Sequence, residues 1–100
     1  MSSLFAVFIT GGAAWRQGLP LEQQEAWRPH ADFMNALLAD GFVALGGPLQ
    51  AQGTHDVLLI IRANAESEIR ERLAADPWHR MDLLRIARIV PWMLKLGELP

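Results

Sequence analysis

The sequence predicts an α+β domain of the split βαβ, ferredoxin-like kind, in which a four-stranded antiparallel sheet carries two helices on one face. Short apolar runs alternate with amphipathic stretches in the order strand, helix, strand, strand, helix, strand. Glycine and proline stand at most of the junctions, where they end regular structure. The length suits one domain, residues 1–100, because chains divide into domains only at two to three times this size.

The first half of the chain supplies a strand and the longer helix. Residues 4–9 are all apolar and precede two glycines, which indicates a buried strand. Residues 21–40 place apolar side chains at steps of three and four, which predicts a helix closed by Gly41. Pro29 interrupts this helix, because a proline lacks the N–H group and clashes with the preceding turn. Either the helix bends at Pro29, or residues 21–27 form a separate turn and Pro29 starts the main helix.

Two strands follow. Residues 42–45 predict the second strand, which we expect to end at Gly46-Gly47-Pro48 because proline cannot donate a ladder hydrogen bond. Residues 55–62 predict the third strand, and its middle is apolar on both faces. This strand should therefore lie inside the sheet.

The second helix has signals at both ends. Asn64 is placed to cap its start, and its first turn is acidic. Asp76 should close it, because Pro77 keeps the preceding residue out of the helical region. Two acid–base pairs have the favourable four-residue spacing along it: Glu66 with Arg70, and Glu68 with Arg72.

The last predicted strand spans residues 83–94, where Pro91 indicates an edge position or a bulge. Two helices cover only one face of the sheet, yet residues 4–9 and 55–62 are apolar on both faces. A second copy of the chain is the simplest cover for the open face, and it would also bury part of the surplus of four tryptophans. We therefore expect a homodimer formed through this face.

The composition excludes several classes of protein. The net charge is −2 with acidic and basic residues interleaved, so we expect neither a nucleic-acid nor a membrane partner. The chain has no cysteine, and its three histidines have no recognised metal spacing, so we expect no metal and no cofactor. The first residues lack the features of a signal peptide, and no apolar run reaches membrane-spanning length. We expect a cytoplasmic protein.

His30 is the residue that most suggests chemistry. It lies in an apolar helical stripe where a titratable ring is unexpected: Trp27, His30, Met34, Leu37 and Leu38. An interior imidazole can transfer protons near neutral pH when a second group holds its other nitrogen. Asp76 is the candidate partner, since a carboxylate at the C-terminus of a helix is disfavoured by the helix dipole and needs a stabilising partner. The alternative is a structural histidine bonded to a backbone carbonyl.

Three other residues are candidates for contact with a substrate. Gly47 and Pro48 belong to the segment Gly46-Gly47-Pro48, which either lets a ligand approach the backbone or simply ends a strand. Trp78 follows Asp76 closely and would line the wall of a pocket at that carboxylate. We take Gly47, Pro48 and Trp78 as predicted substrate-binding residues.

The chain resembles the YCII-related family of small proteins along nearly its whole length. Three segments carry the resemblance: WRPHADFM at residues 27–34, GFVALGGPL at 41–49 and AADPW at 74–78. The resemblance implies a ferredoxin-like fold that assembles as a dimeric α/β barrel, with a cleft in each protomer. It also implies that His30 and Asp76 form the catalytic pair. Pro29 departs from the family pattern, in which a residue without proline's constraint precedes the histidine.

These observations lead to three hypotheses of function. The first is an enzyme that acts on a small, aromatic or cyclic molecule by proton transfer between His30 and the substrate, with lyase or isomerase chemistry. Dehydrohalogenation-like lyase reactions are among the activities that the resemblance implies. The second is a small-molecule binding or sensing module that uses the same pocket. The third is a plain dimerisation domain, which would have no pocket open to solvent at His30.

Overall fold

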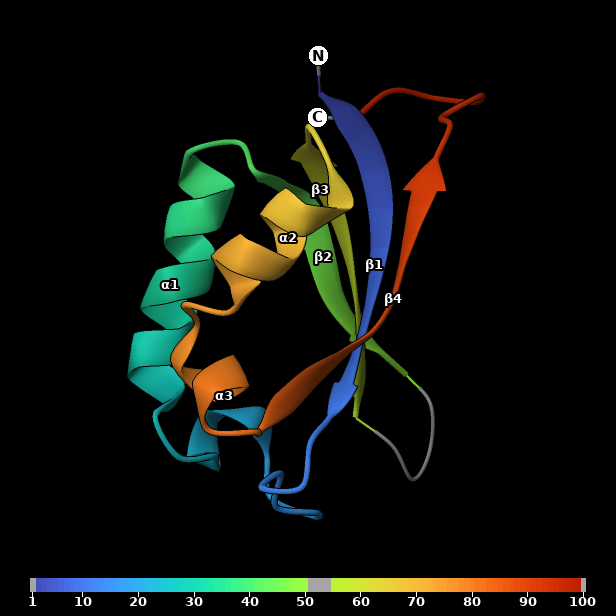
Figure 1. Ribbon diagram of the computed structural model, residues 1–100. Helices are drawn as coiled ribbons and strands as arrows, with labels where there is room; N and C mark the ends of the chain where they lie inside the picture. The colour runs from blue at the N-terminus through green and yellow to red at the C-terminus, as the bar shows by residue number, and fades with distance from the viewer. Residues whose placement is uncertain (1, 51–54, 100) are drawn as a thin grey trace.

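The computed structural model describes residues 2–50 and 55–99, and its architecture confirms the predicted α+β fold (Figure 1). All neighbouring strands are antiparallel, and their order across the sheet is β2-β3-β1-β4. The elements along the chain are β1 (Ser3–Gly11), the 3-10 helix η1 (Leu21–Gln23), α1 (Trp27–Ala39), β2 (Val43–Leu49), β3 (Asp56–Ala63), α2 (Glu66–Leu73), α3 (Pro77–Arg80) and β4 (Leu84–Trp92).

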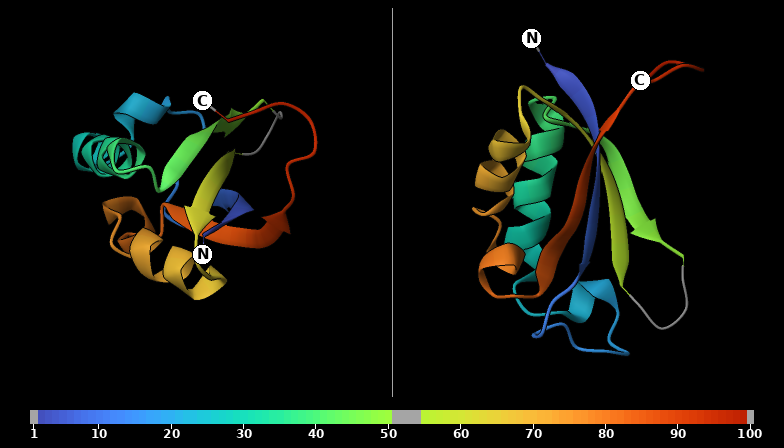
Figure 2. Two further views of the ribbon diagram at one scale, coloured as in Figure 1. Left: turned by 90° about the horizontal axis from the view of Figure 1, so that it is seen from above. Right: turned by 45° about the vertical axis from the view of Figure 1, so that its right-hand side comes forward.

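The helices all lie on one face of the sheet, and the other face is left open (Figure 2). Alternate residues of the central strands point into the layer between helices and sheet, as the period of two requires. Val7 of β1 and Ile61 of β3 have no exposed surface there. Ile69 and Leu73 of α2 are equally buried, so the short helix presents the narrow apolar face that its sequence indicates.

Of the two alternatives for residues 21–40, the structure has the separate turn before the main helix, but the main helix does not start at Pro29. The chain makes a 3-10 turn at Leu21–Gln23, and α1 begins only at Trp27, after Ala26 in the left-handed region (φ 58°). Pro29 is the third residue of α1, not the first. A proline is tolerated there because the first N–H groups of a helix have no intrahelical partner. Leu38, assigned to the buried stripe, is 52% exposed.

The prediction that Gly46-Gly47-Pro48 ends the second strand is also wrong, since β2 continues through it to Leu49. β2 is an edge strand, so Pro48, which has no N–H group, does not interrupt the hydrogen bonding between inner strands of the sheet. A Cβ atom at Gly46 would lie 2.5 Å from Leu59 Cδ2 and 3.0 Å from the Leu58 carbonyl oxygen. Glycine at position 46 therefore allows β2 to approach β3 closely.

The second helix ends earlier than its sequence suggests. α2 stops at Leu73, and Asp76 begins α3 as its N-cap, where the helix dipole favours a negative charge. The prediction of Asp76 at a helix C-terminus is therefore wrong. Its backbone is extended (ψ 129°), as expected before proline.

The start and the outer face of α2 also differ from the prediction. Ala65, not Asn64, is the N-cap, and it makes no side-chain capping bond. Glu68 does not pair with Arg72, because its carboxylate accepts the backbone N–H of Asn64 at 2.8 Å. Arg72 binds Asp40 at 2.7 Å, whereas the predicted pair of Glu66 and Arg70 is present at 3.9 Å.

The two edge strands are irregular. β4 ends at Trp92, two residues before the predicted limit, and Pro91 lies at the edge of the sheet as expected. The register shifts once in β2, at Ala44, and once in β4, at Ala87. Bulges of this kind twist an edge strand and disfavour pairing of its free side with another chain.

Candidate active site

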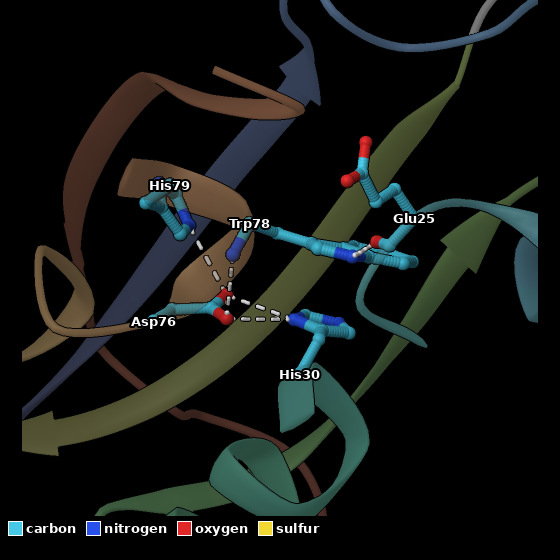
Figure 3. Close-up of polar contacts among 5 residues, drawn as sticks. All are labelled: Glu25, His30, Asp76, Trp78 and His79. Carbon is cyan, nitrogen blue, oxygen red and sulfur yellow. Dashed lines mark hydrogen bonds and ion pairs between the residues drawn. The ribbon is translucent and has the colours of Figure 1, made fainter. Parts of the chain in front are cut away.

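His30 and Asp76 meet in the layer between the helices and the sheet (Figure 3). Nδ1 of His30 lies 2.9 Å from each carboxylate oxygen of Asp76. Asp76 is fully buried, and the side chain of His30 is 12% exposed. An ionised carboxylate only accepts hydrogen bonds, so Nδ1 carries the proton and donates it to Asp76. Nε2 of His30 is then the nitrogen able to take up a proton.

Two features of α3 fix the carboxylate. Asp76 accepts the backbone N–H of Trp78 at 3.1 Å, which is the N-cap bond of this helix. Pro77 occupies the first helical position, where its fixed φ angle favours the helix. The local sequence Asp-Pro-Trp therefore both starts α3 and aims its capping carboxylate at α1.

Trp78 forms the surface on which His30 rests. The two rings are stacked, with centroids 3.8 Å apart and planes 6° from parallel. The indole N–H of Trp78 donates to the carbonyl oxygen of Glu25 at 2.6 Å. Glu25 precedes Ala26, the N-cap of α1, so its carbonyl lies outside the hydrogen-bond ladder of the helix and is available to hold Trp78. Through Trp78 this carbonyl supports His30.

His79 approaches the same carboxylate from another side (Figure 3). Its Nε2 lies 4.0 Å from Oδ2 of Asp76, which is too long for a hydrogen bond, and this buried nitrogen has no partner among the described residues. Burial lowers the pKa of His79 below its usual value, against the attraction of Asp76, which raises it, and His30 lowers it further. His79 is therefore neutral at pH 7.

A cavity of about 430 Å³ opens beside His30. It lies between the first half of α1, α3, the ends of β1 and β2, and the start of β3. The predicted substrate-binding residues Gly47, Pro48 and Trp78 all line it, together with His30 and Asp76. Its other lining residues are mainly apolar, and they are Ile9, Leu21, Trp27, Ala31, Met34, Asn35, Gly46, His55, Val57, Leu59, His79 and Leu84.

His55 and Trp15 are further aromatic groups at this end of the molecule. Their rings are stacked, with centroids 3.8 Å apart and planes 12° from parallel. Trp15 also meets Trp78 edge to face at 5.5 Å, which links the pair to the indole beneath His30. Nε2 of His55 is buried and has no hydrogen-bond partner among the described residues.

The loop between β1 and α1 is held by one buried amide. The side chain of Gln24, which is 3% exposed, donates to the carbonyl oxygens of Arg16 (2.8 Å) and Leu19 (3.2 Å). Its amide oxygen accepts the backbone N–H of Arg16 at 3.1 Å. These three bonds fix the loop that supplies Trp15 and Leu21.

Sequence reasoning missed the contributions of Trp15, His55 and His79 to this region. His79 had a local signal, because it lies three residues after Asp76 and would share a helix face with it. For His55 the signal was the topology of the sheet, because antiparallel pairing of β1 with β3 places Thr10 opposite Asp56. The end of β1 and the start of β3 therefore meet at the same end of the sheet.

Among the described residues, no group of three or more histidine, cysteine, aspartate or glutamate side chains is arranged to hold a metal ion. In the same part of the chain, no helix combines the length and apolar character needed to cross a lipid bilayer.

One comparison with known proteins gives a result. No protein-family model and no curated protein matches the chain, so the resemblance to the YCII-related family stays a prediction. Among solved structures, 5-chloro-2-hydroxyhydroquinone dehydrochlorinase (TftG) from Burkholderia phenoliruptrix AC1100, in complex with 2,5-dihydroxybenzoquinone, is similar to it. The two chains are 22% identical, the match covers 94% of this chain and 95% of that one, and the TM-score is 0.59. They share a fold.

Proposed function

We propose that this protein is an enzyme that binds a small planar aromatic or quinoid molecule in the cavity and transfers a proton through His30. The observation that supports this most directly is the imidazole of His30, bound through Nδ1 to a buried carboxylate, at the wall of an apolar cavity. A plain dimerisation domain needs no such cavity.

In this proposal each residue has a distinct role. Nε2 of His30 takes a proton from the substrate, and Asp76 stabilises the imidazolium that forms, at a distance of 2.9 Å. In an elimination, the electrons of the broken bond to hydrogen form a double bond, and the leaving group departs with its electron pair. In an isomerisation, His30 returns the proton to another atom of the same molecule.

The chemistry of the cavity wall supports the choice of substrate. Trp27 offers an apolar aromatic surface, whereas the ring of Trp78 is buried against His30. No lysine or arginine is present among the described lining residues. A phosphate or carboxylate ligand would lack a counter-ion there. The dehydrochlorinase of similar fold acts on a chlorinated hydroxyhydroquinone and was solved with a planar quinone, which supports a lyase reaction on such a ring.

The test is turnover of chlorinated hydroquinones, followed by release of chloride. We expect the wild type to release chloride and His30→Asn to release none. The free energy of unfolding of His30→Asn should stay within about 1 kcal/mol of the wild type, because a polar group remains next to Asp76. Glu66→Gln, on the outer face of α2, is the control and should keep full activity.

Two results would count against the proposal. The first is a wild type that neither binds nor converts any aromatic or halogenated compound of a broad screen. The second is a His30→Asn variant that is as active as the wild type. Binding without conversion would favour the alternative of a sensing module.

We also propose that the protein is a homodimer through the open face of the sheet. Leu45, Leu49 and Trp92 lie on this face by register, opposite Ile60, Asp56 and Leu4, and each is more than two-fifths exposed. An apolar surface of this kind usually marks an interface. We expect a dimer at micromolar concentration that buries at least about 1,200 Å². Sedimentation of a folded monomer at that concentration would contradict it.

A further inference from the structure

Three polar residues that line the cavity have no role in the mechanism above, namely Asn35, His79 and His55. His55 differs from the other two because it lies beside the sheet, directly before β3. Its ring lines the cavity together with that of His30, but it comes from the start of the sheet strand β3 instead of from a helix. Its backbone carbonyl accepts the N–H of Gly11 at 2.9 Å, which fixes the position of this residue against the end of β1.

The ring of His55 is held by Trp15, and Gly11 makes room for that arrangement. A Cβ atom at position 11 would lie 3.3 Å from Cγ of Trp15, so the indole would have to shift by a few tenths of an ångström to accept a side chain there. The indole in turn stacks on His55 at 3.8 Å. Three residues from two segments therefore cooperate to hold one imidazole at the wall of the cavity.

One nitrogen of this imidazole lacks a hydrogen bond within the part of the chain that the structure describes. Nε2 of His55 is buried and has no hydrogen-bond partner among the described residues, which is a costly state for a polar atom. Burial is the main cause that lowers the pKa of His55, with Asp56 opposing it and His30 lowering it further. The ring is therefore neutral at pH 7 and offers one donor and one acceptor nitrogen.

We propose that His55 is the second hydrogen-bonding point of the cavity, so that the ligand is a planar ring with two oxygen substituents, one directed to His30 and one to His55. This inference rests on the proposed function. Nε2 lies beneath the protein surface, so the ring must turn when the ligand binds. A half-turn about the Cβ–Cγ bond exchanges nitrogens and carbons and keeps the ring stacked on Trp15.

The experiment compares probes with one and two hydroxyl groups. Phenol, catechol, resorcinol and hydroquinone are titrated into the full-length protein under nitrogen, and Kd values are measured by calorimetry or by amide chemical shifts. We expect the wild type to bind at least one dihydroxybenzene ten times more tightly than phenol. His55→Phe keeps a ring on Trp15 but no nitrogen, so this preference should fall to within twofold while the affinity for phenol is unchanged.

Each other outcome has a definite meaning. If the wild type prefers no dihydroxybenzene, or if His55→Phe keeps the preference, the role of His55 is wrong and the proposed function stands. If His55→Phe lowers the affinity for phenol and for the dihydroxybenzenes equally, His55 only shapes the cavity and the inference is again wrong. If the wild type binds none of the four probes, the role of His55 is again wrong, and the broad screen described above decides the proposed function. His55→Leu replaces His55→Phe, with the same expected loss, if the phenylalanine variant does not fold.

Discussion

α2 and α3 lie at opposite ends of the helix layer (Figure 1). The end with α2 is packed with apolar side chains, whereas the end with α3 holds a buried carboxylate, three histidines and a cavity. At the α2 end, Ile69 and Leu73 have no exposed surface. At the α3 end, His55 and His79 each keep a buried nitrogen that has no hydrogen-bond partner within residues 2–50 and 55–99. Apolar packing at the α2 end stabilises a small domain, whereas buried polar groups at the α3 end cost stability. Groups that cost stability are expected at functional sites, so we expect function at the α3 end.

The largest expected difference between the two ends is in the free energy of unfolding, when a mutation creates a cavity at the α2 end. Leu73→Ala should lower the free energy of unfolding by about 2–5 kcal/mol, because the buried side chain leaves a void. Binding of aromatic probes by the folded fraction should not change. Denaturant unfolding measures the first quantity, and Leu38→Ala, at a site that is 52% exposed, is the control with an expected loss below about 0.5 kcal/mol. Equal losses for the two variants would mean that the α2 end is not the stabilising core.

A smaller loss is expected at the α3 end. Asp76→Ala removes the acceptor of two hydrogen bonds, from Nδ1 of His30 and from the backbone N–H of Trp78. The free energy of unfolding should fall by about 1–3 kcal/mol, and ligand binding should be lost as well. If Asp76→Ala is as stable as the wild type, Asp76 does not anchor α3 and the two ends differ less than we infer.

The buried histidines predict a dependence of stability on pH. Because the pKa of His79 is lower in the folded protein than its ordinary value of 6.5, the unfolded chain binds more protons as the pH falls through that value. Stability should therefore be full above pH 7 and should decrease as the pH falls below 6.5. Urea midpoints at pH 7.5 and pH 5.5 measure this decrease. The His79→Phe variant should lose less stability between pH 7.5 and pH 5.5 than the wild type. If the variant loses as much as the wild type, His79 is not the source of the pH dependence.

The smallest expected effect concerns the start of α1. Ala26 has a φ angle of 58°, a conformation that costs a residue with a Cβ atom about 1 kcal/mol or more. Ala26→Gly should relieve this strain and raise the free energy of unfolding by at most about 1 kcal/mol, since glycine also gains entropy in the unfolded chain. Thermal unfolding checks the sign. A clear loss of stability would show that the alanine methyl group packs usefully at this end.

The order of strands and helices along the chain and the two-layer fold were predictable because short apolar runs bounded by glycine or proline indicate strands, and apolar residues at steps of three and four indicate helices. β2 was predicted too short because the rule against proline in strands applies inside a sheet, and whether a strand lies at the edge depends on the whole topology. The short helix α3 was missed because four residues give no periodic pattern. Its N-cap, Asp76, therefore looked like the end of the preceding helix.

The candidate site was predictable only in part. His30 stands out in the sequence because it interrupts an apolar stripe, and its partner Asp76 was suggested by a proline and by the family resemblance. The stacking of His55 on Trp15 depends on residues 40 positions apart, brought together by the pairing of β1 with β3. No local sequence pattern indicates such a contact.

Gln24 has a consequence for how this protein could diversify. One buried amide holds the loop that supplies Leu21 to the cavity wall and Trp15 to the stack on His55, while the rest of the wall belongs to the sheet, α1 and α3. Substitutions at Leu21 and Trp15 that keep this amide in place change the surroundings of the cavity without altering the packing of α2 on the sheet. A laboratory library at these two positions therefore varies the ligand preference and leaves the apolar core unchanged.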